Sequence, residues 1–163
     1  MLGKYVWDLL HNTDKLWVQL LSARYNSESH ILEANNYRGA SYTWRSIAKA
    51  VVALTSGFTT RVGNGDISIW YDKWLPDGRI CDKISSVDEE DTHLHIMDVC
   101  SYDTWNFDII FTHLPQEIKM EMASVFTNED SDDILIWEPS ASGTYSTKSA
   151  YSWLTLVYNP PQI

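Results

Sequence analysis

Hydrophobic positions in the first 57 residues recur at the spacing of amphipathic helices. Two apolar sets with this spacing lie on either side of a break near Asn12: Leu2, Val6, Leu9 and Leu10, then Leu16, Trp17, Leu20 and Leu21. They predict two helices. A third helix is predicted from about Tyr42 to Thr55, with Ser41 as its N-cap and Gly57 as a stop. Residues 1–57 are therefore interpreted as a helical part, with a polar connection over residues 26–40.

A two-residue period begins after Gly57. Ile67, Ile69 and Tyr71 alternate with polar residues and follow the run Gly63-Asn64-Gly65. An Asn-Gly pair takes the positive φ values that a tight hairpin turn requires, and β-branched residues favour the flanking strands. The pattern predicts a clear β-hairpin over about residues 59–71, within the segment 58–76.

The rest of the chain predicts short elements. Residues 93–126 are interpreted as short helices, one of them starting near Pro115. Ile134 to Trp137 alternates as a strand, Tyr145 begins a second short strand, and a last helix opens at Ser146 or Thr147. Segment 133–158 is thus a weak hairpin, about residues 134–146, followed by a helix. The expected fold is a small α+β domain over residues 1–163, in which helices outweigh strands.

Charge is distributed unevenly along the 163 residues. The formal net charge is -10; the first 80 residues hold nine Lys and Arg against seven Asp and Glu, and the rest hold three against fifteen. This balance excludes a uniformly basic nucleic-acid-binding surface, so any such contact must be local. The acidic runs Asp88 to Asp91 and Glu129 to Asp133 are interpreted as solvated loops, with an acidic docking surface as the alternative.

The composition also indicates a compartment. Two cysteines argue against a disulfide scaffold, and no apolar run approaches the roughly 20 residues that span a bilayer. No leader with a basic start, an apolar centre and a small-residue cleavage site is evident. We expect an intracellular protein, nuclear or cytoplasmic, with no membrane partner and no small-molecule substrate.

Two runs of residues carry a family resemblance. Tyr42-Thr43-Trp44-Arg45-Ser46-Ile47, followed by Arg61 to Pro76, resembles the region after the polymerase domain in reverse transcriptases of plant LINE-type (non-LTR) retrotransposons. The similarity continues through Trp105-Asn106, Asp132 to Trp137 and Gly143 to Tyr151, and so covers nearly the whole chain. In that family this region connects the polymerase to a zinc-binding module, whose start is similar to Gly143 to Tyr151, and an RNase H domain often follows.

The resemblance implies a chain without catalytic residues. The family's polymerase carries an aromatic-x-Asp-Asp turn, and none is present here; Asp132-Asp133 follows Glu129-Asp130-Ser131 and is interpreted as a solvated turn. The family's zinc ligands lie beyond Tyr151, and its RNase H carboxylates lie further still. We therefore expect no enzyme activity and no cofactor.

Two other candidate sites lack the required spacing. Cys81, His93, His95 and Cys100 include no Cys-x2-Cys pair, so no metal site is predicted. Gly63-Asn64-Gly65 lies between two strand patterns, whereas glycine-rich phosphate loops lie between a strand and a helix. It is therefore interpreted as a structural turn.

The remaining candidate is a local nucleic-acid patch formed by the third helix and the hairpin. Its predicted residues combine cations with two tryptophans that are not assigned to the core: Arg45, Lys49, Arg61, Trp70, Lys73 and Trp74. RNA or DNA is the expected partner, within a larger polyprotein, and the helix and hairpin should then pack as one unit. The alternatives are a protein-interaction or self-association module that docks through Leu2 to Leu10 and Tyr151 to Val157, or a domesticated or functionless remnant.

Overall fold

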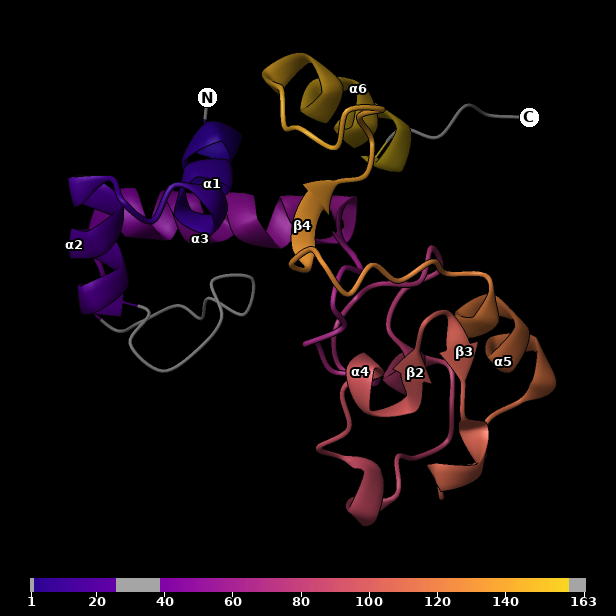
Figure 1. Cartoon of the computed structure of the whole chain (residues 1–163). Helices are drawn as coiled ribbons and strands as arrows, with labels where there is room; N and C mark the ends of the chain where they lie inside the picture. Colours follow the sequence, from indigo (N-terminus) through magenta and orange to yellow (C-terminus); the bar gives the residue numbers. More distant parts are fainter. Residues whose placement is uncertain (1, 26–38, 159–163) are drawn as a thin grey trace. The chain divides into compact units, whose positions relative to one another are not determined.

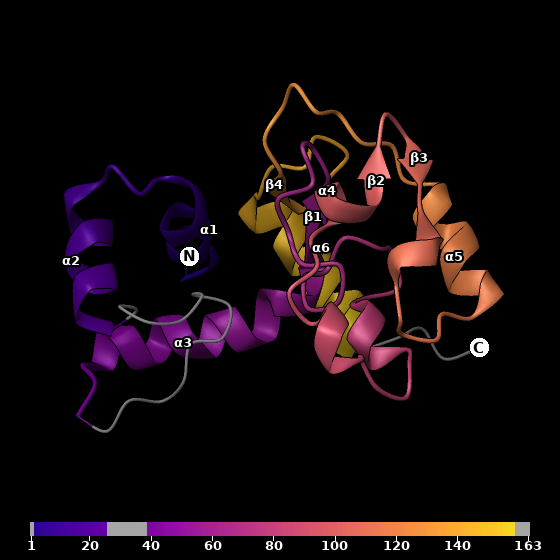
Figure 2. The same ribbon diagram turned by 60° about the horizontal axis from the view of Figure 1, so that its bottom comes forward.

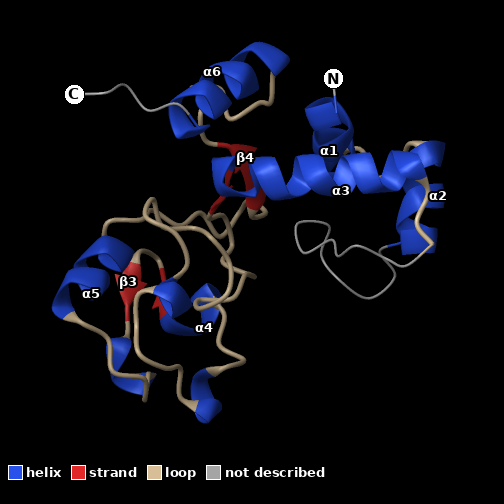
Figure 3. Cartoon of the chain, turned by 180° about the vertical axis from the view of Figure 1, so that it is seen from behind, coloured by secondary structure: helices blue, strands red, loops and turns tan. Residues whose placement is uncertain are grey.

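A computed structural model describes residues 2–25 and 39–158 (Figure 1). The helices are α1 (Leu2–His11), α2 (Leu16–Tyr25), α3 (Tyr42–Leu54), α4 (Ile96–Val99), α5 (Gln116–Ala123) and α6 (Thr147–Tyr158). The strands are β1 (Phe58–Arg61), β2 (Cys100–Ser101), β3 (Thr104–Trp105) and β4 (Ile134–Trp137). Single 3-10 turns are η2 (Thr55–Gly57), η3 (Ile80–Asp82), η4 (Glu89–Asp91) and η5 (Phe107–Ile109). The predicted α+β class, in which helices outweigh strands, is confirmed (Figure 3).

Contacts between Cα atoms divide the chain into two compact units. We call Met1–Phe58 with Trp137–Ile163 the helical unit, and Thr59–Ile136 the central unit. The expected packing of the third helix and residues 59–71 as one unit disagrees with this division, because α3 belongs to the helical unit and residues 59–71 belong to the central unit. The single connector-like domain over residues 1–163 stays a prediction, and most of the predicted connection at 26–40 lies outside the described residues.

The helical unit is built on the apolar face of α3. As predicted, the Ser41 hydroxyl caps α3 by accepting a hydrogen bond from the Trp44 backbone N–H at 3.2 Å. Figure 2 shows α2 at one end of α3 and α1 over α3. The side chains that form the core are buried: Val6, Val18, Trp44, Ile47, Val51, Phe58 and Trp137. Their apolar contacts hold the helices together, because isolated helices of this length are marginal in water.

The central unit has little regular structure and a tightly buried apolar core. Its fully buried side chains include Ile69, Trp70, Leu75, Ile80 and Ile96. Buried polar groups connect the loops around them: the Trp70 indole donates to the Asp91 carbonyl at 2.7 Å. The Asp91 carboxylate in turn accepts hydrogen bonds from the Thr112 backbone and hydroxyl, both at 2.6 Å. Satisfied polar groups of this kind specify one loop arrangement where secondary structure does not.

The predicted hairpin at 59–71 is wrong. Its first arm forms β1, but β1 pairs with β4. The second arm makes only an isolated antiparallel bridge between Ser68 and His95. Gly65 has the predicted positive φ, +82°, but its carbonyl accepts a hydrogen bond from Met97, so the chain turns toward α4. A strand supplied by a distant segment therefore replaces the local partner.

The weaker hairpin at 134–146 is also wrong in its second arm. The first arm is β4, and a turn closes when the Trp137 N–H donates to the Gly143 carbonyl at 2.8 Å. Residues 144–146 form no strand. Instead, the Tyr145 ring packs edge-on against Trp137, with ring centroids 5.3 Å apart. Side-chain packing directs this segment, and the following helix α6 begins at Thr147, as expected.

None of the helices in the described ranges 2–25 and 39–158 is both long and apolar enough to cross a membrane.

Gly57 lies where a side chain has no room. A Cβ atom there would collide with the six-membered ring of Trp137. We expect Gly57→Ala to lower the free energy of unfolding by about 1–3 kcal/mol through overpacking. Urea unfolding followed by tryptophan fluorescence would measure this loss. Thr43→Ala, at an exposed position of α3, is the control and should stay within about 0.5 kcal/mol of the native chain.

Asp8 makes the helical unit sensitive to acid. Burial acts to raise the pKa of Asp8, but hydrogen bonds from Lys15 and Asn12 and the charges of Lys15 and Lys4 outweigh it, so the pKa is lower than its ordinary 3.8. The Lys15 ammonium lies 2.9 Å from the carboxylate. A lowered pKa stabilises the fold above pH 3.8, and this stabilisation is lost as the pH falls through the folded-state value.

We therefore expect Asp8→Asn to flatten the acid limb of the curve of unfolding free energy against pH. Urea titrations at a series of pH values would measure this. Asp14→Asn, which removes an exposed carboxylate, is the matched control. An unchanged acid limb in Asp8→Asn would contradict the assignment.

Candidate nucleic-acid interface

Helix α3 carries an exposed stripe opposite its buried face. With about 3.6 residues per turn, Tyr42, Arg45, Lys49 and Val52 fall within roughly 80° of one another around the helix axis. Tyr42 is 79% exposed, Val52 is 74% exposed, and both cations are exposed. Neither Arg45 nor Lys49 makes an ion pair with any residue in the described ranges. We call these four residues the α3 stripe; it presents two exposed cations beside one aromatic ring.

The amino end of the α3 stripe is fixed by contacts with α2. The rings of Tyr25 and Trp44 stack with centroids 4.6 Å apart. The Ser41 N–H donates to the Tyr25 hydroxyl oxygen at 3.2 Å, and hydrogen bonding with Ser41, together with the Arg24 charge, lowers the pKa of Tyr25 from its ordinary 10.0. The stripe therefore projects from a helix whose orientation within the helical unit is set by packing.

The other two predicted cations lie in the central unit. Arg61 is exposed at the end of β1, and Lys73 is half-buried. The Lys73 carbonyl accepts hydrogen bonds from the Thr60 N–H at 2.7 Å and the Thr59 hydroxyl at 3.2 Å. Lys73 thus lies on the segment beside β1, and these contacts bring Arg61 and Lys73 into the same region.

The two predicted tryptophans do not belong to an interface. Trp70 is fully buried and Trp74 is 5% exposed. Each indole N–H donates to a backbone carbonyl, Trp70 to Asp91 and Trp74 to Ile69. No ring face is left for a base, so burial removes both residues from the predicted patch. The sequence predicts Trp70 on an arm of the hairpin, but residues 67–71 do not form a strand.

Tyr42 is the residue that sequence reasoning missed. It precedes Arg45 by three positions, and a helix period places it on the same face as Arg45 and Lys49. That spacing alone is sufficient to place Tyr42 on the exposed face of the helix. An exposed tyrosine beside cations supplies the stacking surface that the buried tryptophans do not.

The Asp132-Asp133 pair is not a simple solvated turn. Asp132 is exposed, but the half-buried Asp133 carboxylate accepts hydrogen bonds from the backbone N–H groups of Gly63 at 2.6 Å and Gly65 at 3.1 Å. Successive N–H groups in a glycine-rich turn form a concave site for an anion. Here the anion is the chain's own carboxylate, so Gly63-Asn64-Gly65 is a structural turn, as predicted, with a partner that the local sequence does not indicate.

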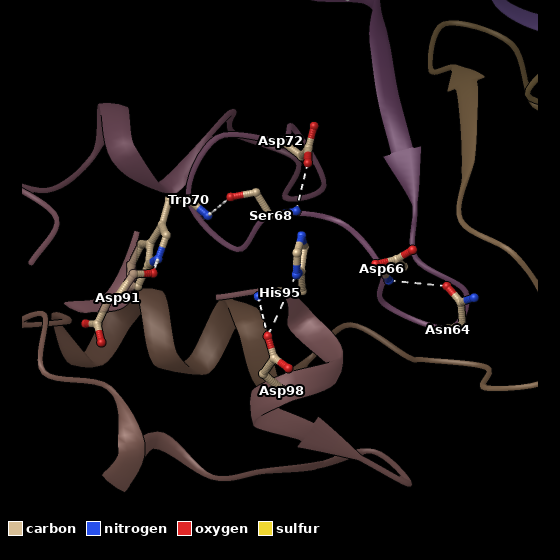
Figure 4. Close-up of polar contacts among 8 residues, drawn as sticks. All are labelled: Asn64, Asp66, Ser68, Trp70, Asp72, Asp91, His95 and Asp98. Carbon is tan, nitrogen blue, oxygen red and sulfur yellow. Dashed lines mark hydrogen bonds and ion pairs between the residues drawn. The ribbon is translucent and has the colours of Figure 1, made fainter. Parts of the chain in front are cut away.

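Ser68, His95 and Asp98 have the residue types of a catalytic triad but a different arrangement. The Ser68 hydroxyl accepts hydrogen bonds from the backbone N–H groups of Trp70 and Tyr71, and Figure 4 shows it directed toward Trp70. Asp98 accepts a hydrogen bond from the His95 backbone at 2.8 Å and caps α4. Within residues 39–158, no hydrogen bond joins the Ser68 hydroxyl to the His95 ring. A nucleophile requires that contact, so these residues serve turns and caps.

The sequence predicts no metal site at Cys81, His93, His95 and Cys100, and the structure does not bring these four residues together in one site. In the part of the chain that the structure describes, no three His, Cys, Asp or Glu residues are placed to hold a metal ion. Burial raises the pKa of both thiols, with the Asp82 charge adding to the effect at Cys81. Both cysteines are thereby disfavoured as thiolates, the form that binds metals.

The chain is distantly similar to plant proteins. No family model and no solved structure matches it. An "Uncharacterized mitochondrial protein" of Arabidopsis thaliana is 31% identical over 78 residues, which are 47% of this chain and 51% of that protein. A "Putative ribonuclease H protein" of the same plant is 26% identical over 172 aligned positions, which cover 96% of this chain and 26% of that protein. The chain thus spans about half of the first relative and about a quarter of the second.

The contact between Asp133 and the glycine turn gives a direct test. We expect Asp133→Ala to lower the free energy of unfolding by about 1–3 kcal/mol, because two N–H groups of buried glycines lose their acceptor. Chemical denaturation would measure it. Asp132→Ala, at the exposed neighbouring position, should change stability by less than about 0.5 kcal/mol. Equal losses of unfolding free energy in the two variants would contradict a specific role for Asp133 and support a solvated turn for both residues.

Proposed function

We propose that this chain is a non-catalytic connecting region of a larger retrotransposon-type protein. The similarity to a quarter of the "Putative ribonuclease H protein" supports this, because it extends over 96% of this chain and leaves most of that protein unmatched. The resemblance of Tyr42 to Ile47 and Arg61 to Pro76 to the LINE-type connector narrows the proposal to the region between the polymerase and the zinc-binding module. In such a protein the region would help position template or target nucleic acid.

The α3 stripe is the observation that carries a nucleic-acid role. Arg45 and Lys49 are one helical turn apart, are exposed, and lie on the same face as the Tyr42 ring. Cations bind the phosphates of a nucleic acid whatever its base sequence, and an exposed aromatic ring stacks on unpaired bases. The stripe therefore suits a single strand better than a duplex, in which the bases are already stacked.

The distribution of charge between the units supports α3 as the centre of this contact. The helical unit holds seven Lys and Arg against five Asp and Glu, a net of +2, whereas the central unit holds five against seventeen, a net of -12. Phosphate is attracted to the first and repelled by the second at low ionic strength. Arg61 and Lys73 lie in the acidic unit and are proposed as a weaker, separate contact.

A protein-interaction module is the second proposal, and exposed apolar side chains at the predicted docking segments favour it. Leu2 and Tyr5 on α1 are 42% and 48% exposed, and Tyr151 and Leu156 on α6 are 74% and 62% exposed. Apolar residues left at the surface are typical of interaction sites when they form a patch. Sedimentation at several concentrations would detect self-association, and a strict monomer without a partner would contradict this second proposal.

Fluorescence anisotropy with labelled single-stranded RNA and duplex DNA tests the nucleic-acid role. We expect the single strand to bind more tightly at low salt. Replacing Arg45 and Lys49 with Ala should weaken binding and reduce the slope of log affinity against log salt by roughly 1 to 2, the effect of losing two phosphate contacts. Tyr42→Ala should weaken binding to the single strand with little change in the slope, because stacking releases no counterions.

Matched controls separate the α3 stripe from overall charge. Lys4→Ala with Lys148→Ala removes two exposed cations from the helical unit but leaves the stripe intact, so it should affect binding less. Arg61→Ala with Lys73→Ala tests the central-unit pair independently. The absence of binding at low salt by a folded sample, or equal losses in all three double variants, would overturn the α3 interface.

A further inference from the structure

The turn between β2 and β3 holds an exposed tyrosine in an uncommon backbone conformation. Tyr102 and Asp103 both have positive φ, +48° and +58°. This left-handed region is uncommon for residues other than glycine and least favourable for bulky ones, whereas asparagine tolerates it. The Tyr102 side chain is 84% exposed at this turn. The side chain therefore gains almost no burial from the position that its backbone adopts.

Hydrogen bonds fix the turn against the segment 126–130. The Asp103 carboxylate accepts from the Thr127 backbone at 2.8 Å and from the Thr127 hydroxyl at 2.9 Å, and these bonds lower the pKa of Asp103. The Glu129 carboxylate accepts from the Tyr102 N–H at 3.0 Å. Phe126, immediately before Thr127, is also 84% exposed. Two exposed rings therefore project from segments that are bonded to each other.

The charged residues in the sequence around these rings are almost entirely acidic. From residue 84 to residue 136 the sequence has thirteen Asp and Glu and one cation, Lys119. The Lys119 ammonium lies over the Phe107 ring, 5.6 Å from its centroid. Glu129 and Asp130 follow Phe126 closely and are exposed. The rings thus face solvent among carboxylates, the surroundings that attract a cationic group to an aromatic face.

We propose that Tyr102 and Phe126, with Glu129 and Asp130, form a docking surface for an arginine- and lysine-rich segment of a partner protein. Guanidinium and ammonium groups bind over the faces of aromatic rings, and the neighbouring carboxylates pair with the same groups. The net charge of -12 on the central unit repels nucleic acid, and the net charge of -10 on the whole chain opposes a second copy. Of these three partners, a basic protein segment is the one whose charge is complementary to the central unit. The site is independent of the α3 stripe.

Binding of fluorescein-labelled octa-arginine to the full chain, followed by anisotropy, tests the docking surface. Tyr102→Asn with Phe126→Ser removes both rings but no charge, and asparagine suits the positive φ at position 102. We expect this double variant to bind about tenfold more weakly. Phe111→Ser removes another aromatic ring of the central unit, 75% exposed, and should bind like the native chain.

A second pair of variants tests the carboxylates. Glu129→Gln with Asp130→Asn removes the two charges of the proposed surface and keeps an oxygen acceptor for the Tyr102 N–H, and Glu89→Gln with Glu90→Gln removes two exposed charges elsewhere in the central unit. The first pair should weaken binding more than the second. Failure of the native chain to bind octa-arginine would overturn the proposal. Equal affinities of the native chain and the ring variant would also overturn it, because attraction would then depend on net charge alone.

Discussion

The pairing of β1 with β4 is the constraint on which the central unit depends. The chain enters this unit at Thr59 and leaves it at Ile136, so the pairing joins its two ends. Closing a loop of this length has an entropic cost, which the contacts made where its two ends meet help to offset. The Asp133 carboxylate also contributes to loop closure. Asp133 immediately precedes β4, and it accepts hydrogen bonds from the N–H groups of Gly63 and Gly65, which follow β1. The loop-rich core inside can then be specified by buried polar contacts.

Local signals in the sequence were sufficient for α3, but they did not identify the buried face of α2, where Leu16 and Leu20 of the predicted apolar set are exposed. The Ser41 cap and the apolar stripe that includes Trp44 and Val51 predicted α3 and its buried face, because both depend on residues within two turns of one another. The same helical period also places the residues of the α3 stripe on the opposite face. The exposed face of a helix can therefore be inferred once its buried face is known. Arg45 and Lys49 were found in this way, and Tyr42 was available from the same spacing.

The errors share one physical cause, which is dependence on distant residues. Asn64-Gly65 carries a strong hairpin signal, yet the strand that pairs with β1 and the carboxylate that fills the glycine turn come from residues 133–137. Trp70 is buried in the apolar core of the central unit, and its indole donates to the Asp91 carbonyl, a contact between irregular segments that no period reveals. Where the fold has little secondary structure, packing between distant segments determines which side chains are buried, and a pattern of alternating residues loses its predictive value.

The two proposed binding surfaces, the α3 stripe and the docking surface around Tyr102, lie in units that differ strongly in net charge. Nucleic acid and a basic protein segment have opposite charge, so one surface cannot serve both. In a chain with a net charge of -10, we expect affinity for phosphate to be strongest where cations lie outside the acidic unit. Arg45 and Lys49 meet this condition, whereas Arg61 and Lys73 lie in the unit with a net charge of -12. Exposed rings occur on both surfaces, Tyr42 beside cations and Tyr102 beside carboxylates. The charge around each ring therefore determines which partner it can bind.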